Sequence, residues 1–228
     1  MKLLVKKETK AQTIGEEIAN AVSHGIMAIF GVVGMILLLV YKNNGNPREL
    51  LAILMFSFGM ILLYTMSTLY HSLAFTKAKG IFKRFDHISI YFLIGGTFAP
   101  ALLLLPSLNT NNPFLGIEWM PQTGMALFII QWILIALGVL IKSIWIYKGK
   151  IIHPIIYLLL GWSALLFVGK LYAFSVPAFW YILSGGLSYS IGVIFYAQPK
   201  MKYFHFIWHI FVGLGTILQF IAIYFYLL

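Results

Sequence analysis

The sequence predicts an all-α, polytopic membrane protein built as a bundle of seven transmembrane helices. Of its 228 residues, 61% are apolar and only 10% are charged, whereas soluble domains carry roughly a quarter charged residues. The mean hydropathy is +0.92. Apolar runs recur along almost the whole chain, and each approaches the ~20 residues that a helix needs to cross a hydrocarbon core of ~30 Å.

Polar residues, proline and glycine interrupt these runs and separate seven predicted spans. The spans cover about residues 20–41, 50–73, 86–106, 122–146, 152–172, 177–197 and 204–227. Residues 1–19 are then a cytoplasmic N-terminal segment, and residues 20–228 are a single seven-helix membrane domain. The longest connection, PSLNTNNPFLGIEWMPQ, is rich in Asn and Pro and predicts a loop outside the membrane, with Trp119 at the interface.

Lysine and arginine gather on one side of these spans. Twelve lie in the N-terminal segment and in the loops after the second, fourth and sixth spans: Lys2, Lys6, Lys7, Lys10, Lys77, Lys79, Lys83, Arg84, Lys148, Lys150, Lys200 and Lys202. Three, Lys42, Arg48 and Lys170, lie on the other side. Because cytoplasmic loops are enriched in Lys and Arg, we expect the N-terminus in the cytoplasm and the C-terminus outside. The same rule explains the net charge of +10 without a nucleic-acid partner.

Two further features limit the class of protein. The basic start of the chain is followed by polar residues where a signal peptide would have its apolar core, so we expect no cleaved leader. The chain has no cysteine, which excludes disulfides and thiolate metal sites. Histidine, aspartate and glutamate are therefore the available strong metal ligands.

Histidine and aspartate are concentrated at one depth of the predicted bundle. All six histidines lie toward the cytoplasmic ends of their spans: His24, His71, His87, His153, His205 and His209. Asp86, the only aspartate in the chain, lies at the same level. Ionisable groups at membrane depth usually mark a functional site, because their desolvation must be offset by a partner.

Helical spacing predicts that some of these groups can share a metal ion. In HFIWH, the four-residue step places His205 and His209 on one helix face, with Cβ atoms roughly 5–6 Å apart. In YTMSTLYH, the same step places Ser67 beside His71. Two imidazoles from one helix and one from another can hold a zinc ion with an open fourth position, as in hydrolytic sites. An isolated histidine pair at a helix end is more typical of an interfacial pair bonded to backbone or water, but His71, Ser67 and Asp86 at the same depth favour the metal.

The remaining polar residues have plainer interpretations. His87 is adjacent to Asp86 and so points about 100° away from it, which predicts a surface neighbour. His153 precedes a proline and reads as a structural residue at a helix start. Glu17, Asn20 and His24 share a helical stripe, which is consistent either with a polar cluster that supports the site or with the simple start of a helix.

Four stretches of the chain resemble the hemolysin III family, the bacterial branch of the progestin and adipoQ receptor superfamily, which includes the adiponectin receptors. They are EEIANAVSHG, STLYH, FDHISIYFLIGGTFAP and GVIFYAQPKMKYFHFIWHIFVGLG, in the expected order and at the expected intervals. The resemblance covers both ends and the first half of the chain, and spans four and five contribute little. It implies seven helices, a cytoplasmic N-terminus and an intramembrane zinc site.

The resemblance also implies roles for individual residues. Carried over by motif, His71, His205 and His209 are the zinc ligands, Asp86 holds the zinc-bound water and Ser67 lies beside it.

The first-span motif of the family matches Glu17, Asn20 and His24, which makes them candidates for the immediate surroundings of the ligands. His153 has no counterpart in these motifs, in keeping with a structural role.

The leading hypothesis is a metal-dependent hydrolase of lipid amides or esters. A zinc ion held by three histidines lowers the pKa of bound water toward ~7 and polarises a carbonyl. Asp86 can orient that water or accept its proton, and Ser67 can hydrogen-bond a developing oxyanion. Membrane lipids are the expected partners, since they reach the site from the bilayer, and related receptors are associated with ceramide-type amide hydrolysis. We expect a multi-pass protein of a bacterial cell membrane.

Other classes are weaker or remain open. A non-catalytic zinc-containing sensor or membrane-homeostasis factor uses the same ligands without turnover. A cytolytic protein, as the family name implies, would need a soluble state that this apolar chain lacks. A channel or transporter remains possible, but the sequence shows no clear inverted repeat and no carboxylate deep inside a span that could couple to protons. A retinal protein would need a lysine within residues 204–227, which contain none. The ligands alone also suit other first-row metals, and the sequence does not indicate an oligomeric state.

Overall fold

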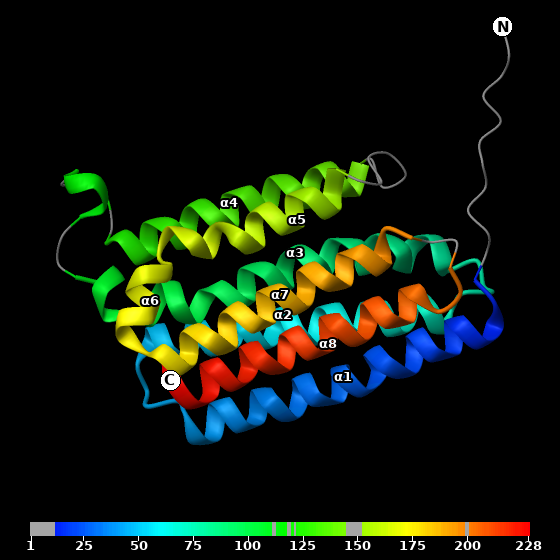
Figure 1. Cartoon of the computed structure of the whole chain (residues 1–228), viewed down its shortest axis with the longest axis horizontal. Helices are drawn as coiled ribbons and strands as arrows, with labels where there is room; N and C mark the ends of the chain where they lie inside the picture. Colours follow the sequence, from blue (N-terminus) through cyan, green and yellow to red (C-terminus); the bar gives the residue numbers. More distant parts are fainter. Residues whose placement is uncertain (1–11, 111–112, 118–119, 121, 145–151, 199–200) are drawn as a thin grey trace, which may run out of the picture.

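The computed structural model describes residues 12–110, 113–117, 120, 122–144, 152–198 and 201–228 as a helical bundle (Figure 1). Its α-helices are α1 (Ile14–Tyr41), α2 (Pro47–Ser72), α3 (Lys79–Leu104), α4 (Thr123–Ile144), α5 (Ile152–Trp162), α6 (Val168–Phe174), α7 (Val176–Tyr196) and α8 (Phe204–Ala222). Six, counting α8 with its π-helical continuation Ile223–Leu227, are long and apolar enough to cross a membrane. The bent pair α5 and α6 is the seventh if it counts as one span. The predicted all-α polytopic membrane fold is confirmed.

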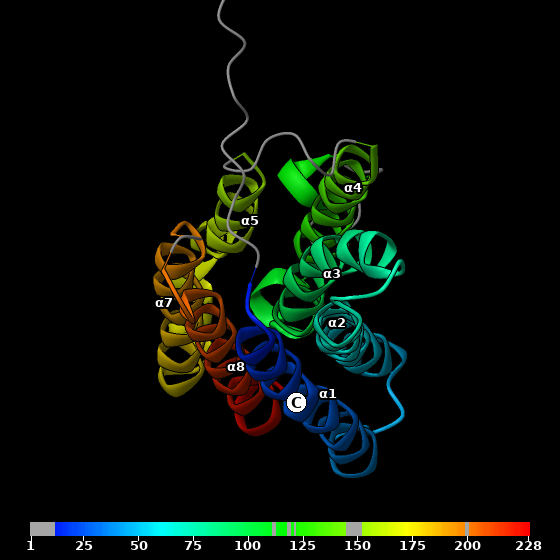
Figure 2. The same cartoon turned by 90° about the vertical axis from the view of Figure 1, so that its right-hand side faces the viewer.

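α1 lies beside α2 and α8 (Figure 2), and α5 contacts both α3 and α7. α2 packs between α1 and α3, and α8 packs between α7 and α1. α4 lies on the outer side of α3. Phe56, Met60 and Tyr64 of α2 are fully buried in the core, and the Tyr64 hydroxyl lies 2.5 Å from the Thr216 hydroxyl of α8. Large aliphatic side chains on the outer faces are exposed, as expected where helices meet lipid.

Glycines allow α2 and α3 to approach closely. A Cβ atom at Gly59 would lie 2.5 Å from the Phe92 carbonyl oxygen, and one at Gly96 would lie 2.6 Å from the Met55 carbonyl oxygen. Small residues at such crossings are typical of membrane helices, where close backbone packing replaces the hydrophobic effect. This contact holds the middle of α2 against α3, and Ser67 and His71 lie nearer the end of the same helix.

The first helix begins earlier than its apolar run. The prediction placed the first span at residues 20–41, but α1 begins at Ile14 and includes the last part of the predicted cytoplasmic segment 1–19. Thr13 caps it: the Thr13 hydroxyl accepts from the Glu16 N–H, and the Glu16 carboxylate accepts from the Thr13 N–H. The polar residues in this first turn are buried, so hydropathy alone could not place the helix start.

Two other spans differ from their predicted form. α3 begins at Lys79 and not near residue 86, so the basic turn is part of the helix. The span predicted at 152–172 is not continuous: a 3-10 turn at Ser163–Leu166 follows α5, and α6 leaves at an angle of 55°. The long loop after α3 contains two short 3-10 turns, while Trp119 lies outside the described residues.

Candidate metal centre

Three histidines from two helices converge inside the bundle. His71 ends α2, while His205 and His209 lie in the first turns of α8. Each offers one ring nitrogen to a group whose members lie within 4.8 Å of one another. The Nε2 atoms of His205 and His209 are 3.1 Å apart. These are the three ligands that the sequence predicted, and their arrangement can hold a metal ion.

Hydrogen bonds to the opposite ring nitrogens prepare two of these histidines as ligands. The Nδ1 atom of His71 lies 2.6 Å from one carboxylate oxygen of Glu17, and the other carboxylate oxygen accepts a hydrogen bond from the Lys79 ammonium group at 3.1 Å. The Nδ1 atom of His209 lies 3.2 Å from the carbonyl oxygen of Asn20. A carboxylate and a carbonyl can only accept, so each Nδ1 carries the proton and each Nε2 keeps its lone pair.

The surroundings of the His71 Nε2 atom give the clearest test of whether a metal ion fits this group. This atom is buried and has no hydrogen-bond partner among the described residues. A buried polar atom without a partner costs free energy, and a metal ion would remove that cost. Metal-ligating histidines typically donate their other N–H to a carboxylate or a backbone carbonyl, as His71 and His209 do here. The donor set therefore fits a metal that accepts imidazole ligands.

The three residues of the first-span stripe surround this cluster. Glu17 and Asn20 provide the contacts described above, and the Asn20 amide also lies 3.5 Å from the His71 ring. The ring of His24 stacks on that of His209, with centroids 3.5 Å apart and an interplanar angle of 5°. His24 is not among the three grouped histidines, and neither of its ring nitrogens has a hydrogen-bond partner among the described residues. The structure thus brings Glu17, Asn20 and His24 to the site as a polar cluster.

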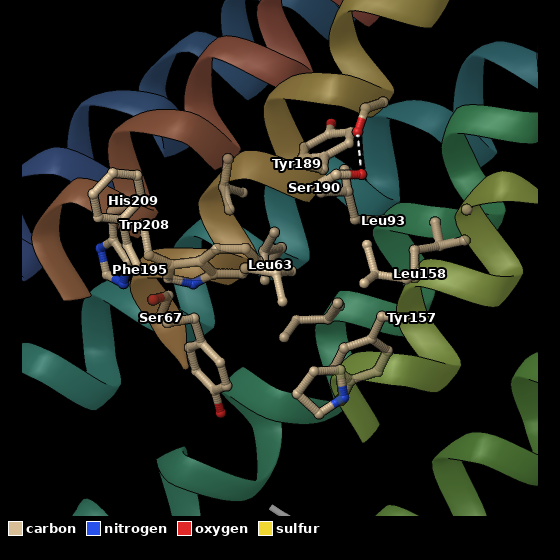
Figure 3. A pocket seen from close by; sticks show the side chains of 18 of the residues that line it. Leu63, Ser67, Leu93, Tyr157, Leu158, Tyr189, Ser190, Phe195, Trp208 and His209 are labelled. Atoms are coloured by element: carbon tan, nitrogen blue, oxygen red, sulfur yellow. Dashed lines mark hydrogen bonds between the residues drawn. The ribbon is translucent and has the colours of Figure 1, made fainter. Parts of the chain in front are cut away.

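A cavity of about 890 Å³ connects the histidines to the interior of the bundle. Figure 3 shows His209 and Trp208 at one end, Tyr157 and Leu158 on the opposite wall, and Leu63 between them. Ser67 and Asp86 also line this cavity. The Ser67 hydroxyl is buried and has no hydrogen-bond partner among the described residues, so it is available to a ligand.

Asp86 and its neighbour His87 face the same cavity. A carboxylate oxygen of Asp86 lies 3.4 Å from the Nδ1 atom of His87, which is 2.7 Å from the Lys83 carbonyl. The side chain of His87 is only 15% exposed, so the prediction of a surface residue was wrong. The start of α3 borders the cavity between α3 and α5. A side chain that points about 100° away from Asp86 on this helix therefore still lies inside the protein.

His153 lies in the first turn of α5, away from the three grouped ligands. It is buried, and its Nδ1 atom lies 3.0 Å from the Tyr91 hydroxyl. This contact joins α5 to α3 and agrees with the structural role that its position next to Pro154 suggested.

Sequence reasoning missed three residues that shape this end of the bundle. The Glu16 carboxylate accepts from the Tyr203 N–H at 2.9 Å and so ties the start of α8 to the start of α1. Tyr203 adopts a left-handed backbone conformation there, with φ of 60°. The Thr13–Glu16 capping pattern was a readable signal for the first contact. Lys142, a lone lysine inside an apolar run, was a signal of the kind that marks functional sites in membranes.

Comparison with known proteins identifies the family. The model of the family described as "Haemolysin-III related" matches residues 12–220. The chain belongs to the hemolysin III family. It is 35% identical to the "Hemolysin-3 homolog" of Bacillus subtilis over 216 residues, covering 94% of this chain and 95% of the relative. It is 32% identical to "Hemolysin-3" of Bacillus cereus over 228 residues, covering 99% and 98%.

More distant relatives extend the match to animals. The human "Monocyte to macrophage differentiation factor" is 27% identical over 221 residues, covering 94% of this chain and 86% of the relative. These relationships place the hemolysin III chain in the progestin and adipoQ receptor superfamily, as its motifs predicted, and its membrane localisation is confirmed. The Bacillus relatives accord with a bacterial origin. No solved structure gave a significant match.

Proposed function

We propose that this hemolysin III family member is a zinc-dependent hydrolase of lipid amides or esters. The observation that carries the proposal is the position of the three histidines at one end of a largely apolar cavity that Ser67 and Asp86 also line. The proposed metal ligands, the proposed proton acceptor Asp86 and the proposed hydrogen-bond donor Ser67 thus line the same cavity inside the membrane domain. Three imidazoles with an open fourth position suit zinc better than hard cations, which prefer oxygen ligands.

The residues around the cavity have different roles in the proposed hydrolysis. When bound, zinc supplies Lewis acidity, which polarises a carbonyl and makes water a better nucleophile. Asp86 accepts a proton from the attacking water and passes it to the leaving amine or alcohol. Ser67 donates a hydrogen bond to the carbonyl oxygen as negative charge develops there. One C–O bond forms from water and the amide C–N or ester C–O bond breaks, which gives a carboxylic acid and an amine or alcohol.

Other residues act through the ligands or hold the substrate. Glu17 is a positioning residue, because its carboxylate contacts the His71 ring and acts through that histidine. Leu63, Leu93 and Leu158 offer an apolar wall to a hydrocarbon chain. This wall excludes water from the chain side, which strengthens the polar interactions at the other end of the cavity.

Comparison of membrane lipids tests the proposal without assuming a substrate. Membranes with the wild-type protein should show one lipid amide or ester decreasing and its carboxylic acid increasing, relative to membranes with Asp86→Asn. This variant has the same size and retains the three histidines, so protein level and metal content serve as controls. Identical lipid profiles for the two proteins would contradict hydrolysis through Asp86.

A non-catalytic metal sensor is the second candidate. It is favoured by the distribution of the cluster over three helices: His71 on α2, His205 and His209 on α8, and their partner Glu17 on α1. Metal binding would therefore change how these helices pack. If lipid profiles are unaffected but metal binding stabilises the fold, this function replaces the hydrolase. The names of the Bacillus relatives indicate cytolysis for those proteins. If the Asp86→Asn variant lysed cells as strongly as the wild type, lysis would be independent of hydrolysis.

A further inference from the structure

Lys142 is a buried lysine inside a membrane span. It lies in the last turn of α4, a helix with no other charged residue, and it is only 4% exposed. Lysines near the ends of spans normally extend to the interface, where the ammonium group is hydrated. Lys142 instead lines the cavity that contains the histidine cluster. It forms no hydrogen bond and no ion pair within 4.0 Å in the part of the chain that the structure describes.

The charged groups near Lys142 do not supply a close partner. Lys83 adds a second positive charge nearby, and Asp86 offsets part of it. Asp86 has its close contact with His87, and the imidazoles of His87 and His153 also lie within electrostatic range of Lys142.

The remaining carboxylates that line the cavity are engaged elsewhere. Glu17 contacts His71 and Lys79, while Glu16 contacts Thr13 and Tyr203. A buried charge without a close counter-charge is costly, so an anion in the cavity would be strongly stabilised beside Lys142.

The composition of the cavity indicates which anion fits. Lys83 adds positive potential beside Lys142, so a phosphate monoester, with a charge of about −1.5 to −2, is attracted by both ammonium groups. The same cavity has apolar walls that include Leu93, Leu158 and Ile182. A phosphate that carries a hydrocarbon chain places its charge beside Lys142 and its chain against the apolar walls, whereas free phosphate makes only the charged contact.

We propose that Lys142 and Lys83 bind the phosphate headgroup of a lipid whose hydrocarbon chain occupies the apolar part of the cavity. As a description of the substrate, this inference rests on the hydrolase function proposed above. Binding itself does not require turnover, so the two proposals can fail separately.

Binding of hexadecyl phosphate and hexadecanol to the detergent-purified protein tests the proposal, with the fluorescence of Trp162 and Trp208 in the cavity wall as the signal. The wild-type protein should bind hexadecyl phosphate at least about tenfold more tightly than hexadecanol, as expected for a charge-assisted contact. Lys142→Gln should lose this preference at unchanged metal content, and Lys142→Arg should retain it. The control is Lys170→Gln, since Lys170 is exposed and contacts the Ser107 carbonyl.

Three outcomes of these binding measurements would overturn the inference, and a fourth comes from the Asp86→Asn variant. They are an undiminished preference in Lys142→Gln, equal binding of the two probes by the wild type, and binding of inorganic phosphate as tight as that of hexadecyl phosphate. Asp86→Asn separates this proposal from the hydrolase: it should bind hexadecyl phosphate more tightly, because a nearby negative charge is gone, while hydrolysis is lost. Weaker binding of hexadecyl phosphate by Asp86→Asn would also contradict the inference.

Discussion

Replacement of Glu17 by glutamine tests how α1 supports the metal ligands. The Glu17 carboxylate lies 2.6 Å from the His71 Nδ1 atom, and both side chains are buried. Glutamine keeps the size and an accepting oxygen but removes the negative charge that orients the His71 ring through its Nδ1–H. Loss of such an outer partner typically weakens metal binding by about 10–100-fold. That range corresponds to about 1.4–2.7 kcal/mol of binding free energy.

Competition with a fluorescent zinc chelator in detergent measures this effect. Glu17→Gln should release zinc at a chelator concentration about 10–100-fold lower than the wild type requires. Glu49→Gln is the matched control, because Glu49 is an acidic residue near the opposite end of the bundle, where its carboxylate accepts a hydrogen bond from the Asn44 N–H. Zinc affinity within about twofold of the wild type in Glu17→Gln would refute the role of this contact in ligand orientation.

Three further predictions separate catalysis, metal binding and folding. Asp86→Asn should keep its zinc but lose hydrolysis by about 10²-fold or more, measured on the lipid that accumulates; retained turnover would exclude Asp86 as the proton acceptor. Ser67→Ala should melt at or above the wild-type temperature, because the Ser67 hydroxyl is buried without a partner, yet hydrolyse more slowly; an unchanged rate would remove Ser67 from the mechanism. Tyr64→Phe should destabilise the bundle by about 1 kcal/mol through loss of the contact with Thr216 and leave zinc content unchanged, and thermal unfolding with metal analysis distinguishes these effects.

The sequence predicted the spans and the ligands because both leave strong local patterns. An apolar run of ~20 residues has few alternatives to a membrane helix, and a four-residue step puts His205 and His209 on one face whatever surrounds them. That His71 joins them depends on the packing of α2 and α8 against α1, which local spacing does not contain. The family motifs supplied this information.

The differences arise where polar residues face inward. Glu17 and Asn20 interrupt the apolar pattern, so the start of α1 was placed too late, although these polar side chains are buried against the histidines. His87 was assigned to the surface from helix geometry alone, which takes no account of a cavity between α3 and α5. Lys142 lies inside a span and therefore did not enter the comparison of loop charges that oriented the chain. The orientation remains a prediction.

Metal analysis of the purified protein tests the central claim most directly. The wild-type protein should contain about one zinc ion per chain, and a variant with both His205→Ala and His209→Ala should contain essentially none. His153→Ala, which removes a buried imidazole outside the cluster, should remain near the wild-type value. Equal zinc in the wild type and the double variant would contradict the assignment of His71, His205 and His209 as the metal centre.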